Sequence, residues 1–208
     1  EAGALAVVHR VGKVGELAAA VSEMGLRGTC GIGHTRWATH GRPSEENAHP
    51  HTSCDGRIAV VHNGIIENFT ELRDELAERG HSFTSETDTE VLAHLVEECY
   101  EGDLLSAVRA AVQRVIGAYG LAVVCADEPG TIVATRKDSP LVVGVAADGA
   151  YVASDIIAMI DATRDVVVLD DFQCAKLTPG AAEYFDARGE RMEPPVTHID
   201  WEVDVAEK

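Results

Sequence analysis

The sequence predicts an α+β protein in which packed sheets are covered by helices. Short β-branched runs, typical of strands, occur near the beginning of the chain and throughout its second half. Three segments with a helical apolar face lie between these two strand regions. Strands and helices therefore do not alternate strictly, as they would in a parallel α/β fold. With 208 residues, 46% of them hydrophobic, the chain is long enough for one domain with a substantial core.

The first third of the chain predicts two strands, one helix and a long loop. Residues Ala4–Val11, rich in Ala and Val, predict a strand. The next segment predicts a helix whose apolar face is formed by Val14, Leu17, Ala18 and Val21. Residues Gly31–His51 are rich in Gly, Pro, His and Asn, the profile of a loop that carries function. The strand Ile58–His62 follows and is expected to end at Asn63-Gly64.

Three helices follow, each with a start signal in the sequence. Asn68 is an N-cap residue, and Gly80 ends the first helix, whose buried face is formed by Phe69, Leu72 and Leu76. The second helix begins after Ser85-Glu86-Thr87-Asp88, so Asp88 lies near its N-terminus. A third helix runs from about Asp103 to Ile116. All three carry apolar stripes and should pack on a sheet.

The remaining chain predicts strands separated by turn residues. The predicted strands are Tyr119–Ala126, Thr131–Arg136, Leu141–Ala146, Tyr151–Ala153, Val166–Leu169, Cys174–Leu177 and Glu183–Phe185. After Pro194-Pro195 the chain becomes polar and acidic. The sequence therefore predicts one domain over residues 1–195 and the start of a linker over residues 196–208.

Charge and cysteine content exclude several classes of function. Seventeen basic and 35 acidic residues give a net charge of −18, which opposes binding to nucleic acid or to an anionic membrane. Without a long apolar stretch or a leader, the protein is expected to be cytoplasmic. The five cysteines are odd in number and far apart, so we expect no disulfide framework and no zinc site. No metal or other cofactor is expected.

The loop between Gly33 and His51 gathers groups that could bind a small polar ligand. Arg36 offers a fork of donors suited to a carboxylate, and Thr39, His40 and His49 could orient an amide. Any one of these histidines could instead be structural. A metal site at His49 and His51 is disfavoured because no carboxylate or cysteine lies at a helpful spacing.

Two further groups have both a functional and a structural interpretation. Asn63 and Gly64, at the end of a strand, could donate hydrogen bonds to a developing oxyanion. Asn-Gly is equally the commonest pair in a hairpin turn. Asp88 could accept hydrogen bonds from a ligand ammonium group, or it could cap its own helix. Both alternatives remain open at this point.

Four ordered motifs resemble one enzyme family. GHTRWATHG at Gly33–Gly41, NAHPH at Asn47–His51, HNGIIENF at His62–Phe69 and SETDTEV at Ser85–Val91 are similar to the glutaminase domain of glucosamine-6-phosphate synthases, the isomerizing glutamine–fructose-6-phosphate aminotransferases. Later segments, including VASDIIA at Val152–Ala158, also resemble this family. The resemblance covers nearly the whole chain.

The resemblance implies a four-layer αββα N-terminal-nucleophile hydrolase fold that releases ammonia from L-glutamine. The ammonia would serve a sugar isomerase domain of the same parent chain, which would be a homodimer. Arg36 and Asp88 would hold the α-carboxylate and α-amino group of glutamine, and Asn63 with Gly64 would form the oxyanion hole. Thr39, His40 and His49 would line the pocket, and Trp37 would belong to the loop that closes over it.

In this family the nucleophile is an N-terminal Cys in a Cys-Gly-Ile motif, with the free α-amino group as its base. The chain begins with Glu1, so we expect the fold to be incomplete at its N-terminus and the 208 residues to bind glutamine without hydrolysing it. Cys30-Gly31-Ile32 is not a replacement, because Cys30 is internal and has no free amine. The alternatives are a glutaminase domain serving another acceptor and an inactive glutamine-binding module.

Overall fold

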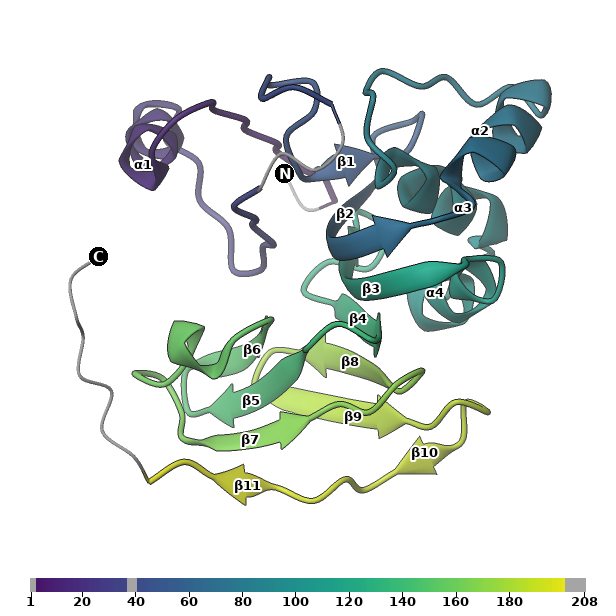
Figure 1. Cartoon of the computed structure of the whole chain (residues 1–208). Helices are drawn as coiled ribbons and strands as arrows, with labels where there is room; N and C mark the ends of the chain where they lie inside the picture. Colours follow the sequence, from purple (N-terminus) through teal and green to yellow (C-terminus); the bar gives the residue numbers. More distant parts are fainter. Residues whose placement is uncertain (1–2, 37–40, 201–208) are drawn as a thin grey trace.

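The computed structural model describes residues 3–36 and 41–200, which form two antiparallel sheets with a group of helices on one side (Figure 1). The helices are α1 (Val14–Glu23), α2 (Phe69–Glu78), α3 (Glu90–Cys99), α4 (Leu104–Val112) and the 3-10 turn η1 (Ile156–Ala158). The strands are β1 (His51–Thr52), β2 (Ile58–Ile66), β3 (Gly117–Cys125), β4 (Ile132–Lys137), β5 (Val142–Ala146), β6 (Gly149–Ala153), β7 (Asp165–Val168), β8 (Cys174–Thr178), β9 (Ala181–Phe185), β10 (Arg191–Met192) and β11 (Thr197–His198).

The larger sheet has seven strands in the order β1-β2-β3-β4-β8-β9-β10, and the smaller has four in the order β11-β7-β5-β6. The central ladder of the larger sheet pairs β2 with β3 from Ile58 opposite Cys125 to Ile66 opposite Gly117. All paired strands are antiparallel. The α+β class expected from the sequence is confirmed.

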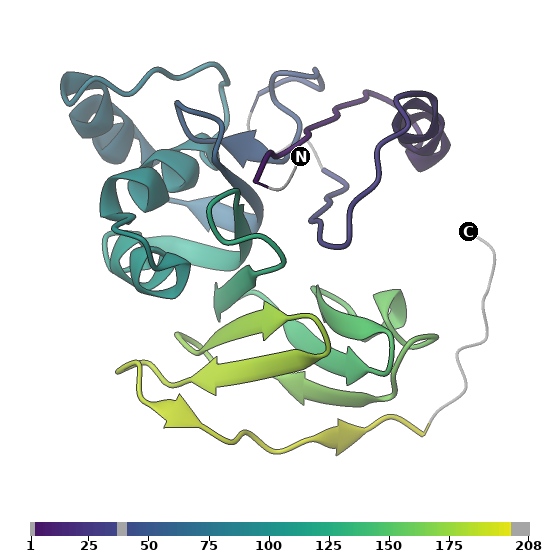
Figure 2. The same ribbon diagram turned by 180° about the vertical axis from the view of Figure 1, so that it is seen from behind.

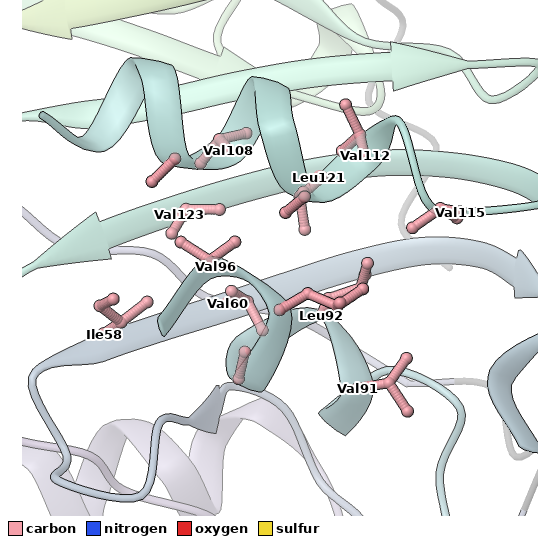
Figure 3. Packing of buried hydrophobic residues seen from close by; sticks show 14 of the residues in the cluster. Ile58, Val60, Val91, Leu92, Val96, Val108, Val112, Val115, Leu121 and Val123 are labelled. Atoms are coloured by element: carbon pink, nitrogen blue, oxygen red, sulfur yellow. The ribbon is translucent and has the colours of Figure 1, made fainter. Parts of the chain in front are cut away.

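The main core lies between the helices and one face of the larger sheet (Figure 3). Alternate residues of β2 and β3, including Val60 and Leu121, point toward α3 and α4, as the period of two in a strand requires. Helix α3 is buried around most of its circumference, since every residue from Glu90 to Val96 is buried. The core contacts of α3 therefore fix the position of its N-terminus, and with it that of Asp88, two residues before the helix.

The second sheet packs against the opposite face of the first. Ala134, Ala175 and Leu177 of the larger sheet contact Val143 and Val167 of the smaller one in a second apolar cluster. On the outer face of the smaller sheet, Met159 and Ile160, after η1, cover Val142 and Val166 in a third cluster. The layers thus follow the order helices, larger sheet, smaller sheet and η1. The rear view shows the blue and teal helices beside the first strands of the larger sheet, with the green and yellow strands of the second half of the chain below them (Figure 2).

Three local expectations were wrong. Residues Ala4–Val11 are not a strand, because they join no ladder in the described part of the chain. The strand that begins at Ile58 does not end at Asn63-Gly64 but continues through Ile66. Asn68 makes no side-chain cap; its amide bonds to the segment before β3 instead, donating to Arg114 O at 2.9 Å and accepting from Ile116 N–H at 2.9 Å.

The last described residues still belong to the packed structure. Strand β11 pairs with β7, and Ile199 is buried beside Val166 in the third apolar cluster. Ordered contacts therefore reach beyond residue 195, into the segment expected to begin a linker. Within the described residues, no helix is both long and apolar enough to cross a membrane.

Candidate active site

Four histidines lie close together: His34, His49 and His51 from the polar loop and β1, and His62 from β2. The rings of His34 and His49 stack with centroids 4.1 Å apart, and His51 lies edge-on to His49 at 5.0 Å. The backbone N–H of His62 donates to His49 Nδ1 at 3.4 Å. His62 itself donates from Nε2 to Ala118 O at 3.3 Å and accepts from the Thr89 hydroxyl at 2.9 Å. The polar loop is thereby joined to β2, to β3 and to the start of α3.

Asn63 is oriented by one of these histidines. His34 Nε2–H donates to Asn63 Oδ1 at 2.7 Å. Because the carbonyl oxygen of the amide is engaged, both protons on Nδ2 remain for another acceptor. Sequence reasoning placed Asn63 in the site but missed the role of His34, which stands at the start of HTRWATHG and 29 positions from its partner.

Gly64 is required by the close approach of β3. Its φ is +136°, a region that L side chains rarely adopt. A Cβ at this position would lie 2.0 Å from Ala118 O of the paired strand. The Asn-Gly pair is thus part of a strand and not a hairpin turn. Of the two interpretations of this pair, the structure contradicts the turn and leaves the backbone N–H of Gly64 beside the oriented amide of Asn63.

Arg36 lies at the edge of a cavity of about 190 Å³ whose wall includes His34 and His49. Its side chain is partly exposed, and Nη2 donates to Gly41 O at 3.2 Å. The remaining donors of the guanidinium can bind a carboxylate. Trp37, Thr39 and His40, also expected in the site, lie outside the described residues.

Asp88 is buried and does not cap its own helix. Its Oδ2 accepts from Ile66 N–H at the end of β2, at 2.8 Å. Its negative charge raises the pKa of His62, although burial of that ring is the larger effect and lowers it. The carboxylate is therefore held at the end of β2, where its charge acts on His62.

Asn47 and Glu90 fix the polar loop and the segment that precedes Asp88. Neither residue was identified from the sequence. Asn47 accepts from Glu86 N–H at 2.8 Å and donates to Glu86 Oε2 at 3.2 Å, which ties the polar loop to the segment before Asp88. The buried Glu90 carboxylate accepts four hydrogen bonds from the backbone and hydroxyl groups of Thr84 and Ser85, at 2.7–2.9 Å. Both residues lie inside motifs quoted above, Asn47 in NAHPH and Glu90 in SETDTEV, and this was the only indication of their importance in the sequence.

The histidines of the site are neutral near pH 7. Burial is the largest cause in each case, and it lowers the pKa of His34, His49 and His62 and brings that of His51 to about 4. The positive charge of Arg36 lowers the pKa of His34, His49 and His51 further. Neutral imidazoles can donate and accept hydrogen bonds at once, which suits the orientation of an amide.

Acidification is expected to weaken the fold through His51. Its pKa of about 4 in the folded state lies below its ordinary value of 6.5, so between these values the unfolded chain binds more protons. The contribution of neutral His51 to the free energy of unfolding is complete above pH 6.5 and is lost as the pH falls toward 4. A pKa shift of this size corresponds to about 3 kcal/mol. Urea unfolding should show the stability difference between wild type and His51→Gln shrinking by that amount between pH 7 and pH 4. A difference independent of pH would contradict this assignment.

Cys30 lies in a larger cavity of about 790 Å³, bounded by the N-terminal segment and the face of β2 and β3 that points away from the helices. Burial raises the pKa of its thiol. Its one hydrogen bond in the described residues goes to Thr131 O at 4.0 Å. A protonated thiol beside a carbonyl is a poor nucleophile, which supports the expectation that Cys30 is not catalytic.

Comparison with known proteins points to the same chemistry. A family profile described as a glutamine amidotransferase domain matches residues 34–161. The chain is 51% identical over 202 residues to the isomerizing glutamine–fructose-6-phosphate aminotransferase of Symbiobacterium thermophilum, covering 97% of this chain and 33% of that protein. It is 51% identical over 204 residues to a Thermus thermophilus enzyme of the same name, covering 98% and 34%.

A solved structure supports the fold. The glutamine phosphoribosylpyrophosphate amidotransferase of B. subtilis, complexed with ADP and GMP, superimposes with a TM-score of 0.61 at 26% identity, covering 74% of this chain and 34% of that one. The chain spans about a third of the length of the curated relatives it matches. The chain belongs to the glutamine amidotransferase domain family, as a glutaminase domain of the kind found in glutamine–fructose-6-phosphate aminotransferases.

Proposed function

We propose that this domain binds L-glutamine and that, in its parent enzyme, it hydrolyses the side-chain amide to supply ammonia. The ammonia is used by a sugar isomerase domain of the same parent chain to convert fructose-6-phosphate to glucosamine-6-phosphate. The identity of about half of all residues to enzymes named for this reaction supports the assignment. The domain spans residues 1–195 together with the packed segment through Ile199, and the chain after it leads to the isomerase domain. The parent is a homodimer, which light scattering of the parent enzyme tests.

The hydrogen bond from His34 to Asn63 is the observation that carries the proposal. It turns the Asn63 amide so that Nδ2 and the Gly64 N–H can both donate to the oxygen of the substrate amide as negative charge develops there. Arg36 holds the α-carboxylate of glutamine and Asp88 its α-ammonium group, while Thr39, His40 and His49 line the pocket. Trp37 belongs to the loop that closes over the substrate.

Arg36→Ala is expected to weaken the binding of L-glutamine by about 10- to 100-fold, because a charge-assisted hydrogen bond to the α-carboxylate contributes about 1.5–3 kcal/mol. Isothermal titration calorimetry with L-glutamine measures the loss. Arg42→Ala is the matched control, since Arg42 is an exposed arginine of the same loop and should leave the affinity unchanged. Equal binding by wild type and Arg36→Ala would exclude this role for Arg36.

Hydrolysis in this family needs the N-terminal cysteine that the resemblance implies, so ammonia release is measured with the parent enzyme. We expect the parent enzyme to bind L-glutamine and to release ammonia from it. Binding without turnover in the parent would instead identify an inactive glutamine-binding module, and ammonia release without glucosamine-6-phosphate formation would indicate another acceptor.

A further inference from the structure

The geometry points to a Zn²⁺ site formed by Cys54, His81, His94 and Glu97, which we call the Cys54 cluster. The spacing of these residues along the chain matches no zinc motif, so the sequence alone did not indicate it. The fold brings the residues together from three segments. Cys54 lies in the turn between β1 and β2, His81 follows α2, and His94 and Glu97 lie one turn apart on α3. One potential ligand atom from each lies within 4.8 Å of the other three.

The separations within the cluster fit tetrahedral zinc. Cys54 Sγ lies 3.5 Å from Nδ1 of His81 and 3.5 Å from Nδ1 of His94. Glu97 Oε2 lies 3.1 and 3.2 Å from the same two nitrogens. Zn–S and Zn–N bonds of about 2.3 and 2.05 Å at tetrahedral angles require a sulfur–nitrogen distance of about 3.6 Å, and two N or O ligands stand about 3.3 Å apart. The four measured distances agree with these values to within about 0.2 Å.

The ligand types also favour zinc over harder cations. Thiolate and imidazole suit Zn²⁺, whereas Mg²⁺ and Ca²⁺ prefer oxygen ligands throughout. The thiolate of Cys54 and the carboxylate of Glu97 together neutralise the charge of one Zn²⁺ ion. Because the protein supplies all four ligands, the site is closed and has no open position for a substrate. The role of the ion is therefore structural.

The groups around the two imidazoles provide an independent argument. A histidine that binds a metal through one nitrogen usually donates its other ring N–H to a carboxylate. His81 Nε2 faces Glu98 Oε1 at 3.5 Å, and the carboxylate oxygen nearest to His94 Nε2 is Glu90 Oε1, at 4.0 Å. Both Nδ1 atoms point into the cluster, so both Nε2 atoms are left for these outer carboxylates.

Without an ion, the hydrogen bonds of His94 are inconsistent with its surroundings. If its Nδ1 carries the proton and donates to Glu97, the neutral ring presents a bare Nε2 toward the Glu90 carboxylate. That nitrogen is buried, and it has no hydrogen-bond partner within the described residues. Metal binding at Nδ1 places the proton on Nε2, where it is directed toward Glu90 and the mismatch is removed.

The ion would fix α3 relative to its surroundings. It would join α3 to the β1–β2 turn and to the loop after α2, near the end of the helix that is farther from Asp88. Glu90, which anchors the segment before Asp88, faces the zinc ligand His94. The expected effect of zinc is therefore on stability and on the position of α3, with no direct part in the reaction.

The untagged chain, freed of metal by a chelator and then titrated with Zn²⁺, is expected to bind one equivalent. At a free Zn²⁺ concentration about 100 times the dissociation constant, Tm should rise by about 5–10 °C. Co²⁺ in place of Zn²⁺ should give visible absorption bands of a four-coordinate ion and a near-ultraviolet thiolate-to-cobalt band. Binding of less than one equivalent, or a cobalt spectrum without the thiolate band, would overturn the assignment.

Variants separate the proposed ligands from other thiols and imidazoles. Removing a residue that only hydrogen-bonds to a metal ligand lowers metal affinity by about 10- to 100-fold. Removing a ligand itself should cost more, so Cys54→Ser and His94→Ala should each lower the zinc affinity by at least about 100-fold. Glu98→Gln should lose about 10-fold and keep the thiolate band. Cys30→Ser and His198→Ala are matched controls, because both residues are exposed and belong to other parts of the structure. Cys54 is exposed, so its variant should fold; unchanged zinc affinity in Cys54→Ser would refute the site.

Discussion

Replacing Glu90 with Gln is expected to lower the free energy of unfolding by about 3 kcal/mol. The carboxylate is 3% exposed and accepts two hydrogen bonds from Thr84 and two from Ser85. An amide keeps the shape but turns one acceptor into a donor, which leaves a buried backbone N–H facing another N–H group. Urea unfolding at pH 7 measures the loss, and Tm should fall by about 6–12 °C.

The stability lost in Glu90→Gln is also expected to depend on pH. Burial tends to raise the pKa of Glu90, but the hydrogen bonds from Thr84 and Ser85 together outweigh it, and the pKa is lowered from its ordinary value of 4.5. The stabilisation is therefore complete above pH 4.5 and is lost as the pH falls through the lowered pKa. The difference between wild type and Glu90→Gln should shrink below pH 4.5. Glu78→Gln, at an exposed position on α2, is the control and should change stability by less than about 0.5 kcal/mol.

Gly64→Ala is expected to lower the free energy of unfolding by about 3–5 kcal/mol and to abolish ammonia release by the parent enzyme. Its Cβ would lie 2.0 Å from Ala118 O and 2.7 Å from Ala118 C, so β2 and β3 would have to separate. The positive φ adds about 1–3 kcal/mol of backbone strain, and overpacking typically costs a further 1–3 kcal/mol. Chemical unfolding measures the first effect and an ammonia assay the second.

Gly56→Ala separates the collision from the backbone strain. Gly56 also has a positive φ, of +71°, but a Cβ there would meet no atom within 4 Å. We therefore expect a loss of only about 1 kcal/mol and unchanged ammonia release. If both variants lost the same stability, the close approach of Ala118 would not be the reason for glycine at position 64.

The helices were predictable because their signals are local. An apolar face repeated every three or four residues marked α2, α3 and α4. The structure adds that Asp103 caps α4 by accepting from Ser106 N–H at 2.9 Å. Strands depend on partners that can be distant in sequence. The run Ala4–Val11 has strand composition but joins no ladder among the described residues, so composition alone predicted the wrong element.

The candidate site was predictable as a set of residues but not as an arrangement. The motifs indicated Arg36, Asn63, Gly64 and Asp88, whose roles remain predictions. They did not indicate the bond from His34 that turns the Asn63 amide, nor the partner of Asp88 at Ile66, because each contact spans more than twenty positions. The Cys54 cluster is the extreme case, since its ligands come from three segments and resemble no contiguous motif.

Strand β4 has a consequence for how the domain unfolds. Val133 belongs to the apolar cluster under the helices, while the adjacent Ala134 belongs to the cluster between the sheets, on the opposite face of the same strand. Loss of β4 would open both clusters at once, so neither half retains a closed core when the other melts. The described structure should therefore behave as one cooperative unit, with no partly folded half that persists by itself.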